Sequence, residues 1–429
     1  MWQIIFADLL RRVERSVTNS CYSFGKREIT KTHDASSLAI NLLAPHAPPY
    51  RTALVFFDAG GGHRNAALAL QTVIEQQGLP FETFLMNLQE VLDPLDFLRK
   101  VTGLRIQEIY NRMLRNGWTL GSPQLMRVLQ WAVRLYHQPS VRLLERYWQE
   151  SKPDLVVSLV PHFNRALWES FTKTFPGRPF VTVLTDLADY PAHFWIEEQP
   201  QFLVCGTERA AEQARSLGHA DAFIFRTSGM VLHPRFYEPD PADRALERKK
   251  LGLDPDSPTG IVLFGGYGSW KMLDIFRAIN RSHMEVQLIL ICGRNEKLAQ
   301  ALRREAPRIR IHVEGFTTRV PFYMALSDFL IGKPGPGSIS EALAKRLAVI
   351  VDCNAWTLPQ ERYNAQWIRE NEVGLVVPSH SKTVSAVAKL LQSGELARYR
   401  QRAAKFQNRA VFEVPEIFGK ILRHGCPPR

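Results

Sequence analysis

The chain has 429 residues, of which 45% are hydrophobic and 10% aromatic, so it can bury a sizeable core, and its length suggests two or three domains. Lysine and arginine (54) outnumber aspartate and glutamate (42), and the net charge of +12 favours anionic partners. No apolar run approaches the ~18 residues of a membrane-spanning helix, and the five cysteines form no C-x-x-C pair. These features disfavour a transmembrane protein, a zinc finger and a disulfide-rich secreted domain.

Strand and helix patterns alternate from residue 51 onward, which predicts an α/β protein with two doubly wound, Rossmann-like domains that face each other across a cleft. Five strands are expected in the first half, at about 52–58, 81–86, 154–160, 180–185 and 202–205. Five more are expected in the second half, at about 260–265, 286–292, 309–313, 328–331 and 348–352. The predicted parts are an N-terminal extension (1–50), a first domain (51–235), a linker (236–258), a second domain (259–400) and a C-terminal helix (401–429) that packs back on the first domain.

The first loop of chemical interest lies in LVFFDAGGGHRNAALAL, residues 54–70. A strand, a glycine turn and a helix follow one another, as in phosphate-binding loops, but the letters fit neither G-x-G-x-x-G nor G-x-x-x-x-G-K-[ST]. Either Gly61 and Gly62 hold a phosphate through their backbone, or the turn presents His63 for chemistry. In isolation, such a histidine is more often a helix cap or a surface residue.

Residues 97–150 hold nine Lys/Arg against three Glu, which is half of the net charge of the chain. Tryptophan, tyrosine, leucine and methionine are interleaved with these basic residues. Basic residues mixed with interfacial aromatics suit an anionic membrane surface. The alternative is a core helix with basic residues on its solvent side. The residues expected to face a membrane or acceptor are Trp118, Arg127, Trp131 and Arg134.

A carboxylate, Asp186, follows an apolar strand in VTVLTDLADYPAHFW. It is expected at the edge of the cleft, because the carboxyl ends of parallel strands line that crevice. Three roles stay open for it: a general base, a partner that orients a histidine, or a cap of the next turn.

Three loops of the second half follow strand ends and open helices. In IVLFGGYGSW (261–270), the glycines permit close backbone approach and Ser269 is a natural N-cap. In ICGRN (291–295), Arg294 could contact a phosphate or stack on a nucleotide base, although a lone arginine is more often a surface charge. In LIGKPGPGSISEALAKR (330–346), Lys333 precedes a turn set by Pro and Gly. Ser338 then caps a helix whose N-terminus is a metal-free anion site.

Two acidic residues in this half have competing interpretations. Glu341 lies one turn into the helix after Ser338, where it can accept hydrogen bonds from ribose hydroxyls or complete a capping box with Ser338. The segment PQERYNAQWI places Gln360 and Asn364 on one helix face beside Glu361. These polar groups suit sugar hydroxyls, and the alternative is a solvated helix start.

Six motifs in this order resemble the GT-B glycosyltransferases, most closely the group of monogalactosyldiacylglycerol synthases and processive diacylglycerol glucosyltransferases, which is related to the peptidoglycan GlcNAc-transferase. The resemblance covers about residues 52–395. The motifs are AGGGHR (59–64), FGGYGS (264–269), CGRN (292–295), EGF (314–316), KPGPGSISEAL (333–343) and PQERYNA (359–365).

The resemblance implies that the second domain binds a UDP-sugar. The diphosphate would face Gly266, Tyr267, Gly268 and Ser269, and also Gly335, Pro336, Gly337 and Ser338. Glu341 would bind the ribose, and the backbone near Phe316 would meet the uracil. Gln360 and Glu361 would lie near the hexose. Lys333 and Arg294 would neutralise the leaving group without a metal.

The first domain would then bind the acceptor. Attack by a hydroxyl needs a general base, for which His63 and Asp186 are both candidates. Gly61 and Gly62 would approach the donor from across the cleft. A T-D…H-x-W segment of the family matches Thr185, Asp186, His193 and Trp195, so His193 and Trp195 are expected on the acceptor side.

The function implied is inverting transfer of a hexose from a UDP-sugar to a lipid such as diacylglycerol, without cofactor or metal. The protein is expected in the cytoplasm, peripheral on the inner membrane face. Alternatives are a non-hydrolysing UDP-GlcNAc epimerase, a transferase with a non-lipid acceptor, and a degenerate transferase that only binds a lipid or a partner. No nucleic-acid partner is expected, because zinc-finger, RNP and basic-zipper patterns are missing from the sequence.

Overall fold

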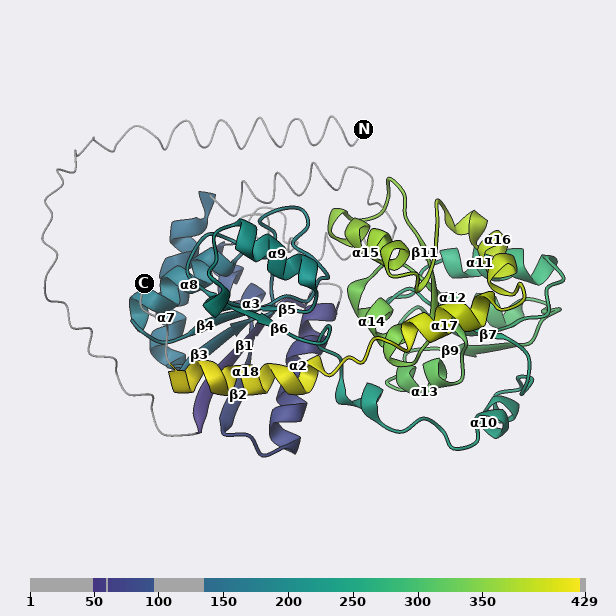
Figure 1. Cartoon of the computed structure of the whole chain (residues 1–429), viewed down its shortest axis with the longest axis horizontal. Coiled ribbons are helices and arrows are strands. Elements are labelled where there is room, and N and C mark those ends of the chain that lie inside the picture. The colour runs from purple at the N-terminus through teal and green to yellow at the C-terminus, as the bar shows by residue number, and fades with distance from the viewer. Residues whose placement is uncertain (1–48, 59–60, 96–134, 425–429) are drawn as a thin grey trace, which may run out of the picture. The chain divides into compact units, whose positions relative to one another are not determined.

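The computed structural model describes residues 49–58, 61–95 and 135–424. They form two α/β domains, each with a parallel sheet of six strands between layers of helices (Figure 1). The predicted fold class is therefore confirmed.

The first sheet has the strand order β2-β1-β3-β4-β5-β6. Its strands are β1 (Tyr50–Phe56), β2 (Phe81–Asn87), β3 (Leu155–Ser158), β4 (Phe180–Val183), β5 (Phe202–Cys205) and β6 (Ile224–Arg226). Strands β3, β4 and β5 are buried throughout, as expected for strands covered on both faces. Strand β6 was not predicted, because it has three partly exposed residues at the sheet edge and no readable pattern.

Helices cover both faces of this sheet. They are α2 (Gly62–Gln76), α3 (Leu88–Leu92), α7 (His137–Ser151), α8 (Asn164–Thr174) and α9 (Glu208–Ser216). Helix α2 buries Ala66, Leu70 and Val73, which recur at helical spacing and therefore share one face. Because α2 starts directly after the first glycine loop, that face fixes His63 at the carboxyl end of β1.

The second sheet has the order β12-β11-β10-β7-β8-β9. Its strands are β7 (Thr259–Leu263), β8 (Gln287–Ile291), β9 (Ile311–Glu314), β10 (Phe329–Gly332), β11 (Ala348–Asp352) and β12 (Gly374–Val377). Strand β12 was also not predicted. It too lies at a sheet edge, and its middle residues are only partly buried.

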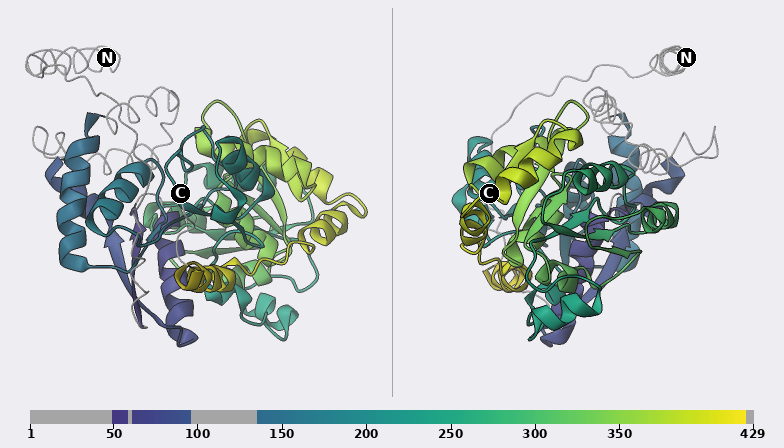
Figure 2. Two further views of the ribbon diagram at one scale, coloured as in Figure 1. Left: turned by 60° about the vertical axis from the view of Figure 1, so that its left-hand side comes forward. Right: turned by 90° about the vertical axis from the view of Figure 1, so that its right-hand side faces the viewer.

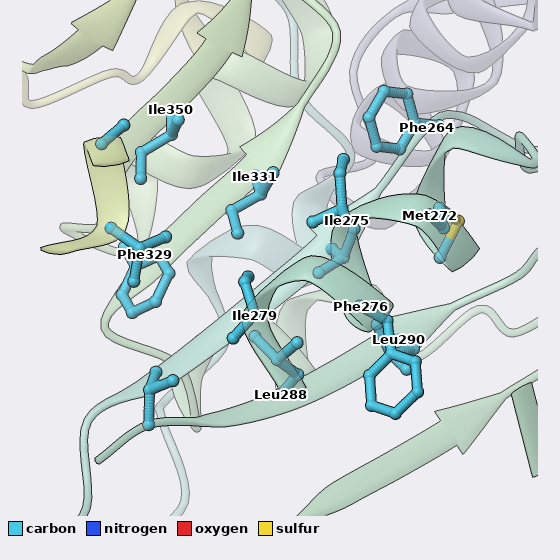
Figure 3. Packing of buried hydrophobic residues seen from close by; sticks show 14 of the residues in the cluster. Phe264, Met272, Ile275, Phe276, Ile279, Leu288, Leu290, Phe329, Ile331 and Ile350 are labelled. Carbon is cyan, nitrogen blue, oxygen red and sulfur yellow. The ribbon is translucent and has the colours of Figure 1, made fainter. Parts of the chain in front are cut away.

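The helices of the second domain pack against its sheet and form two clusters of buried hydrophobic residues. They are α10 (Arg244–Lys250), α11 (Lys271–Arg281), α12 (Glu296–Arg304), α13 (Val320–Ala325), α14 (Pro336–Ala344), α15 (Pro359–Glu370), α16 (Thr383–Leu390) and α17 (Glu395–Ala403). Figure 3 shows Met272, Phe276 and Ile279 of α11 packed with Leu288 and Leu290 of β8. This packing holds the start of α11, and with it the FGGYGS loop, at the carboxyl edge of the sheet.

The segment expected as a linker contains a helix that is anchored to the second domain. Arg248 of α10 is buried and donates to Asp328 at 2.8 Å, and Arg244 donates to the other oxygen of the same carboxylate at 2.8 Å. Arg400 of α17 also donates to Asp328, at 3.0 Å. Burial raises the pKa of Asp328, but Arg244, the backbone N–H of Thr259 and Arg248 together hold it below its usual range.

The last helix, α18 (Ala410–His424), belongs to the core of the first domain. Val411, Val414 and Phe418 are buried with residues of α2 and the first sheet, and the rings of Phe81 and Phe418 lie 6.2 Å apart. In Figures 1 and 2, α18 lies beside α2. The chain therefore crosses between the domains twice. The two crossings are joined where the backbone N–H of Arg409 donates to the Ser228 hydroxyl at 2.6 Å.

Candidate active site

His63 lies in the first turn of α2, two residues after Gly61. The φ of Gly61 is 85°, a left-handed conformation that favours glycine. Its Nδ1 is 3.0 Å from the Thr185 hydroxyl, and its ring centroid is 5.8 Å from that of Trp195. Burial lowers the pKa of His63 to about 4, and the backbone of Leu159 opposes this shift. The imidazole is therefore neutral at physiological pH.

Asp186 follows β4 and is buried. The indole N–H of Trp195 donates to its Oδ2 at 2.8 Å. Burial raises the pKa of Asp186 to about 7; the Trp195 hydrogen bond and the charge of Lys333 oppose the rise, while Glu361 and Asp189 add to it. A carboxylate with this pKa suits a general base at neutral pH.

Trp195 differs from its expected role on the acceptor side. Its side chain is fully buried, so in this structure the indole positions Asp186 instead of contacting a ligand. His193, two residues earlier, is exposed and has a φ of 62°.

Asp189 organises this loop and was missed by the sequence reasoning. Its carboxylate accepts the backbone N–H groups of His193 at 2.8 Å and Trp195 at 2.6 Å. The only sequence signal for it is a second aspartate three residues after Asp186 in TDLAD.

His162, at the end of β3, was also missed. Its backbone N–H donates to Phe194 at 2.8 Å, and its φ is 67°. Its Nε2 is buried and has no hydrogen-bond partner among the described residues. Burial lowers the pKa of His162 to about 4, so this ring too is neutral. Because β3 lies between β1 and β4, His162 comes from the strand end between those that carry His63 and Asp186.

In the second domain, the FGGYGS and CGRN loops interlock through their glycines. A Cβ on Gly268 would lie 2.3 Å from the Cys292 carbonyl oxygen, and one on Gly293 would lie 2.4 Å from that of Gly266. A Cβ on Gly266 itself would meet no atom of the described residues within 4 Å. Gly268 is therefore needed for loop packing, whereas Gly266 leaves open space beside the backbone.

The side chains beside these glycines make contacts that the sequence did not predict. Helix α11 begins at Lys271 with Trp270 as its N-cap, so Ser269 is not the cap that the sequence suggested. The Ser269 hydroxyl accepts the N–H of Lys271 at 3.4 Å. Tyr267 is exposed. The guanidinium of Arg294 lies 4.8 Å from the ring centroid of the exposed Phe316. Arg294 and Phe316 are thus brought together at the ends of β8 and β9.

Helix α14 begins at Pro336 with Gly335 as its N-cap, so Ser338 is not the cap that the sequence suggested. The Ser338 hydroxyl donates to the Gly335 carbonyl at 3.4 Å. Within the part of the chain that the structure describes, a Cβ on Gly337 would meet nothing within 4 Å, and no side chain caps the first-turn amides of α14. Such a helix start favours an anion.

Lys333 and Glu361 form an ion pair, with the ammonium 2.6 Å from Oε1. Glu361 and Asn364 are buried, which contradicts the alternative of a solvated helix start. The Asn364 amide donates to the Pro334 carbonyl at 2.8 Å. Among the described residues, Oδ1 of Asn364 and Oε1 of Gln360 are buried without a hydrogen-bond partner. Such acceptors are costly unless a ligand supplies a donor.

Glu341 lies in the middle of α14 and forms no capping box with Ser338. Burial raises the pKa of Glu341 to about 7, with no compensating group among the described residues. A carboxylate that is desolvated and unpaired is stabilised by a ligand that donates hydrogen bonds.

Trp118, Arg127, Trp131 and Arg134 lie outside the described residues. Of the basic and aromatic segment 97–150, α7 is described, and its Trp148 is fully buried with its indole donating to Ser170 at 2.9 Å. Trp148 is therefore a core residue. Within residues 49–58, 61–95 and 135–424, no helix is long and apolar enough to cross a membrane.

Comparison with known proteins agrees with this arrangement. Residues 261–417, which hold all the predicted donor loops of the second domain, match the glycosyltransferase family 28 C-terminal domain. The probable monogalactosyldiacylglycerol synthase of Nicotiana tabacum is 27% identical over 401 residues, covering 88% of this chain and 71% of the relative. Monogalactosyldiacylglycerol synthase 1 of Arabidopsis thaliana is 26% identical, covering 87% and 72%.

The chain is a GT-B homologue of the monogalactosyldiacylglycerol synthases. The resemblance identified from the six motifs is confirmed. Among solved structures, Acinetobacter baumannii MurG aligns with a TM-score of 0.54 at 15% identity, covering 87% of this chain and 100% of MurG. A UDP complex of S. aureus MnaA aligns with a TM-score of 0.55 at 15% identity, covering 87% and 96%. These structures support the GT-B fold alone, and the individual site residues of this GT-B chain stay predictions.

Proposed function

We propose that the chain is an inverting hexosyltransferase that moves a hexose from a UDP-sugar to a hydroxyl of a diacylglycerol-like lipid. Two features support this proposal. The relatives named above are monogalactosyldiacylglycerol synthases, and the family 28 domain contains every loop of the second domain that is expected to bind the donor.

The observation that carries the proposal is the effect of two charges of the second domain on Asp186 in the first. Glu361 raises the pKa of Asp186 and Lys333 lowers it. A buried carboxylate suited to proton abstraction is therefore within electrostatic range of Glu361, which is expected near the transferred sugar, and of Lys333, which is expected at the diphosphate. That geometry suits a reaction in which acceptor and donor come from opposite domains.

In the proposed step, Asp186 removes the proton of the acceptor hydroxyl as its oxygen attacks the anomeric carbon. The bond from that carbon to the diphosphate breaks, and UDP leaves with the electron pair. Lys333, Arg294 and the first-turn amides of α14 stabilise the charge on the leaving group. A single displacement of this kind inverts the anomeric centre.

We assign His63 a positioning role beside Asp186. A ring with a pKa of about 4 is a weak base, whereas Asp186 titrates near neutrality. The contact of His63 with Thr185 places the neutral ring against Trp195, which in turn holds Asp186.

The acceptor is a lipid in this proposal, so the protein works at a membrane surface. Segment 97–134, with its basic and aromatic residues, is the proposed contact of the first domain with an anionic inner leaflet. Catalysis without a metal and without nucleic-acid binding remains part of the same proposal.

A screen for UDP release tests the function. Purified protein is incubated with UDP-galactose or UDP-glucose and with lipid acceptors presented in anionic vesicles. We expect UDP and glycolipid in equal amounts, dependent on both substrates. A panel of UDP-sugars and lipids that yields no UDP, with none of them bound, contradicts the proposal.

The alternative of a UDP-GlcNAc epimerase is not favoured, because the named relatives are lipid galactosyltransferases. Incubation of the protein with UDP-GlcNAc alone separates the two. An epimerised product without an acceptor supports the alternative, whereas unchanged UDP-GlcNAc supports transfer.

A further inference from the structure

Exposed aromatic side chains occur on several loops that follow strands of the two sheets. Among the described residues, the large hydrophobic side chains that stay exposed are Leu135, Tyr136, Tyr190, Leu246, Tyr267, Trp270, Phe316 and Trp356. Five of these eight lie on loops that follow β4, β7, β9 or β11, and all five are aromatic. Large aromatic side chains are costly to leave in water, so exposed ones on loops that are tied to each other indicate a contact surface.

The two tryptophans of this group, Trp270 and Trp356, are about half exposed, at 50% and 48%. We call this pair the tryptophan rim. Phe316 is considered separately, because its ring, although exposed, already has the guanidinium of Arg294 4.8 Å from its centroid. Both tryptophans belong to the second domain, at the starts of α11 and α15.

The buried carboxylate of Asp352 joins the two loops of the tryptophan rim. Its Oδ2 lies 3.1 Å from the ammonium of Lys271, next to Trp270. The same oxygen accepts the amide of Asn354 at 3.4 Å, and Asn354 in turn accepts the N–H of Trp356 at 2.9 Å. The backbones that carry the two indoles are thus held to one anchor.

The loop of Trp356 is fixed at further points. The Arg362 guanidinium donates to the carbonyl oxygens of Thr357 at 3.2 Å and Ala355 at 3.4 Å. The Thr357 hydroxyl accepts the N–H of Asn354 at 2.9 Å. The loop is therefore stabilised in a conformation that leaves the indole partly in solvent. The exposure of the Trp356 side chain therefore results from a loop conformation that hydrogen bonds stabilise.

The chemistry of the rim matches a lipid interface. Indole rings are enriched at the headgroup level of membranes, because one part of the ring is apolar and the N–H needs a polar partner. Lys382, in the turn that follows β12, is exposed, and the turn packs against α11. The net charge of +12 adds attraction to an anionic surface.

We propose that Trp270 and Trp356 insert at the headgroup level of an anionic membrane and give the second domain its own contact with the bilayer. The choice of a lipid partner rests on the proposed function. This contact holds the second domain at the surface in which a lipid acceptor resides.

Tryptophan fluorescence tests this directly. The full chain is mixed with vesicles of phosphatidylcholine and phosphatidylglycerol in equal parts, with and without brominated acyl chains, which quench nearby indoles. We expect Trp270→Phe and Trp356→Phe each to reduce the quenched part of the emission. Trp367→Phe is the matched control, because Trp367 packs against Phe406 at 5.2 Å and its removal should leave that part unchanged.

Vesicle affinity gives a second readout. The double variant Trp270→Ser, Trp356→Ser should bind the same vesicles about tenfold more weakly, because apolar area buried at the interface is lost. Its affinity for UDP, measured by calorimetry without vesicles, should match the wild type, which shows that the second domain is folded.

Three outcomes overturn the inference: wild-type protein that does not bind these vesicles, a double variant that binds them like the wild type, or Phe variants with unchanged quenching. A double variant with normal vesicle binding and reduced affinity for UDP-hexose assigns the indoles to the donor sugar and also overturns it. Neither readout needs turnover. A chain that binds vesicles through the rim but transfers no hexose therefore contradicts the proposed function and not the membrane contact.

Discussion

Two opposing effects set the pKa of the Asp186 carboxyl group: burial raises it, and the hydrogen bond from Trp195 lowers it. Burial disfavours the charged carboxylate, and the indole hydrogen bond favours it. Because the two effects oppose each other, the pKa of Asp186 is sensitive to the loss of the Trp195 indole N–H that contacts the carboxylate.

Replacing Trp195 by Phe should move the pH dependence of transfer upward. The wild-type rate is expected to rise as the pH passes about 7, where Asp186 loses its proton. Without the indole N–H the carboxylate is less stable, so the pKa rises further and the acid limb shifts to higher pH. The check is kcat/KM against pH for both proteins, with Trp367→Phe as control. An unchanged midpoint removes Trp195 from this role.

The buried carboxylate of Glu341 lowers the stability of the folded protein when it is charged. Its pKa is raised from 4.5 to about 7, so the folded protein holds a proton that the unfolded chain has lost. Stability therefore falls as the pH rises from about 4.5 to about 7, and it stays reduced above that range.

Glu341→Gln should stabilise the unliganded protein by about 1 to 2 kcal/mol at pH 8, with little effect at pH 4. It should also weaken UDP binding about tenfold, because a charged acceptor for the ribose is lost. Denaturant unfolding at the two pH values and calorimetry with UDP measure both effects. Unchanged UDP affinity would falsify the ribose role.

At the scale of elements, the loops after β7 and β8 depend on each other. Gly268 has a φ of 61° and lies against the Cys292 carbonyl, whereas Gly266 adjoins open space. The sequence predicted glycines that let a ligand approach. The structure assigns Gly268 and Gly293 to loop packing, which depends on long-range proximity that no single motif reveals.

Gly266→Ala and Gly268→Ala form a matched pair. Ala at 268 should cost at least about 2 kcal/mol, because its Cβ meets a carbonyl and its backbone is strained. Ala at 266 should leave stability within about 1 kcal/mol and weaken UDP binding by filling the space beside the loop. Thermal unfolding and UDP calorimetry separate the two. Equal loss of stability in both variants contradicts this division of roles.

Element prediction worked where patterns were long and buried and failed at sheet edges. The ten predicted strands correspond to β1–β5 and β7–β11, whereas β6 and β12 are short, partly exposed edge strands. Asp189 and His162 were missed for a different reason. Both residues matter because they contact the loop around Trp195, and no sequence pattern predicts those contacts.

For the whole molecule, α18 makes the first domain depend on the end of the chain. Phe418 is fully buried among residues of the first sheet and of α2, and α2 lies more than 300 residues earlier in the sequence. The two domains are therefore not independent segments: the first is completed only after the second has been traversed.

Phe418→Ala should destabilise the first domain by about 3 kcal/mol or more, because it leaves a cavity in a packed core. Hydrogen exchange should show lost protection in β1–β5, with β7–β11 little changed. UDP binding should persist, since the predicted donor loops lie in the second domain. Equal loss of protection in both sheets would mean that the two cores unfold as one unit.

The measurement that tests the central claim most directly is transfer by wild type and Asp186→Asn in one assay. UDP-galactose or UDP-glucose is supplied with diacylglycerol in anionic vesicles, and UDP and glycolipid are both quantified from pH 5 to pH 9. The wild type should form the two products in equal amounts, with an acid limb near pH 7. Asp186→Asn should lose at least about a hundredfold in kcat while binding UDP normally. Wild type without glycolipid, or Asp186→Asn with normal turnover, would contradict the account.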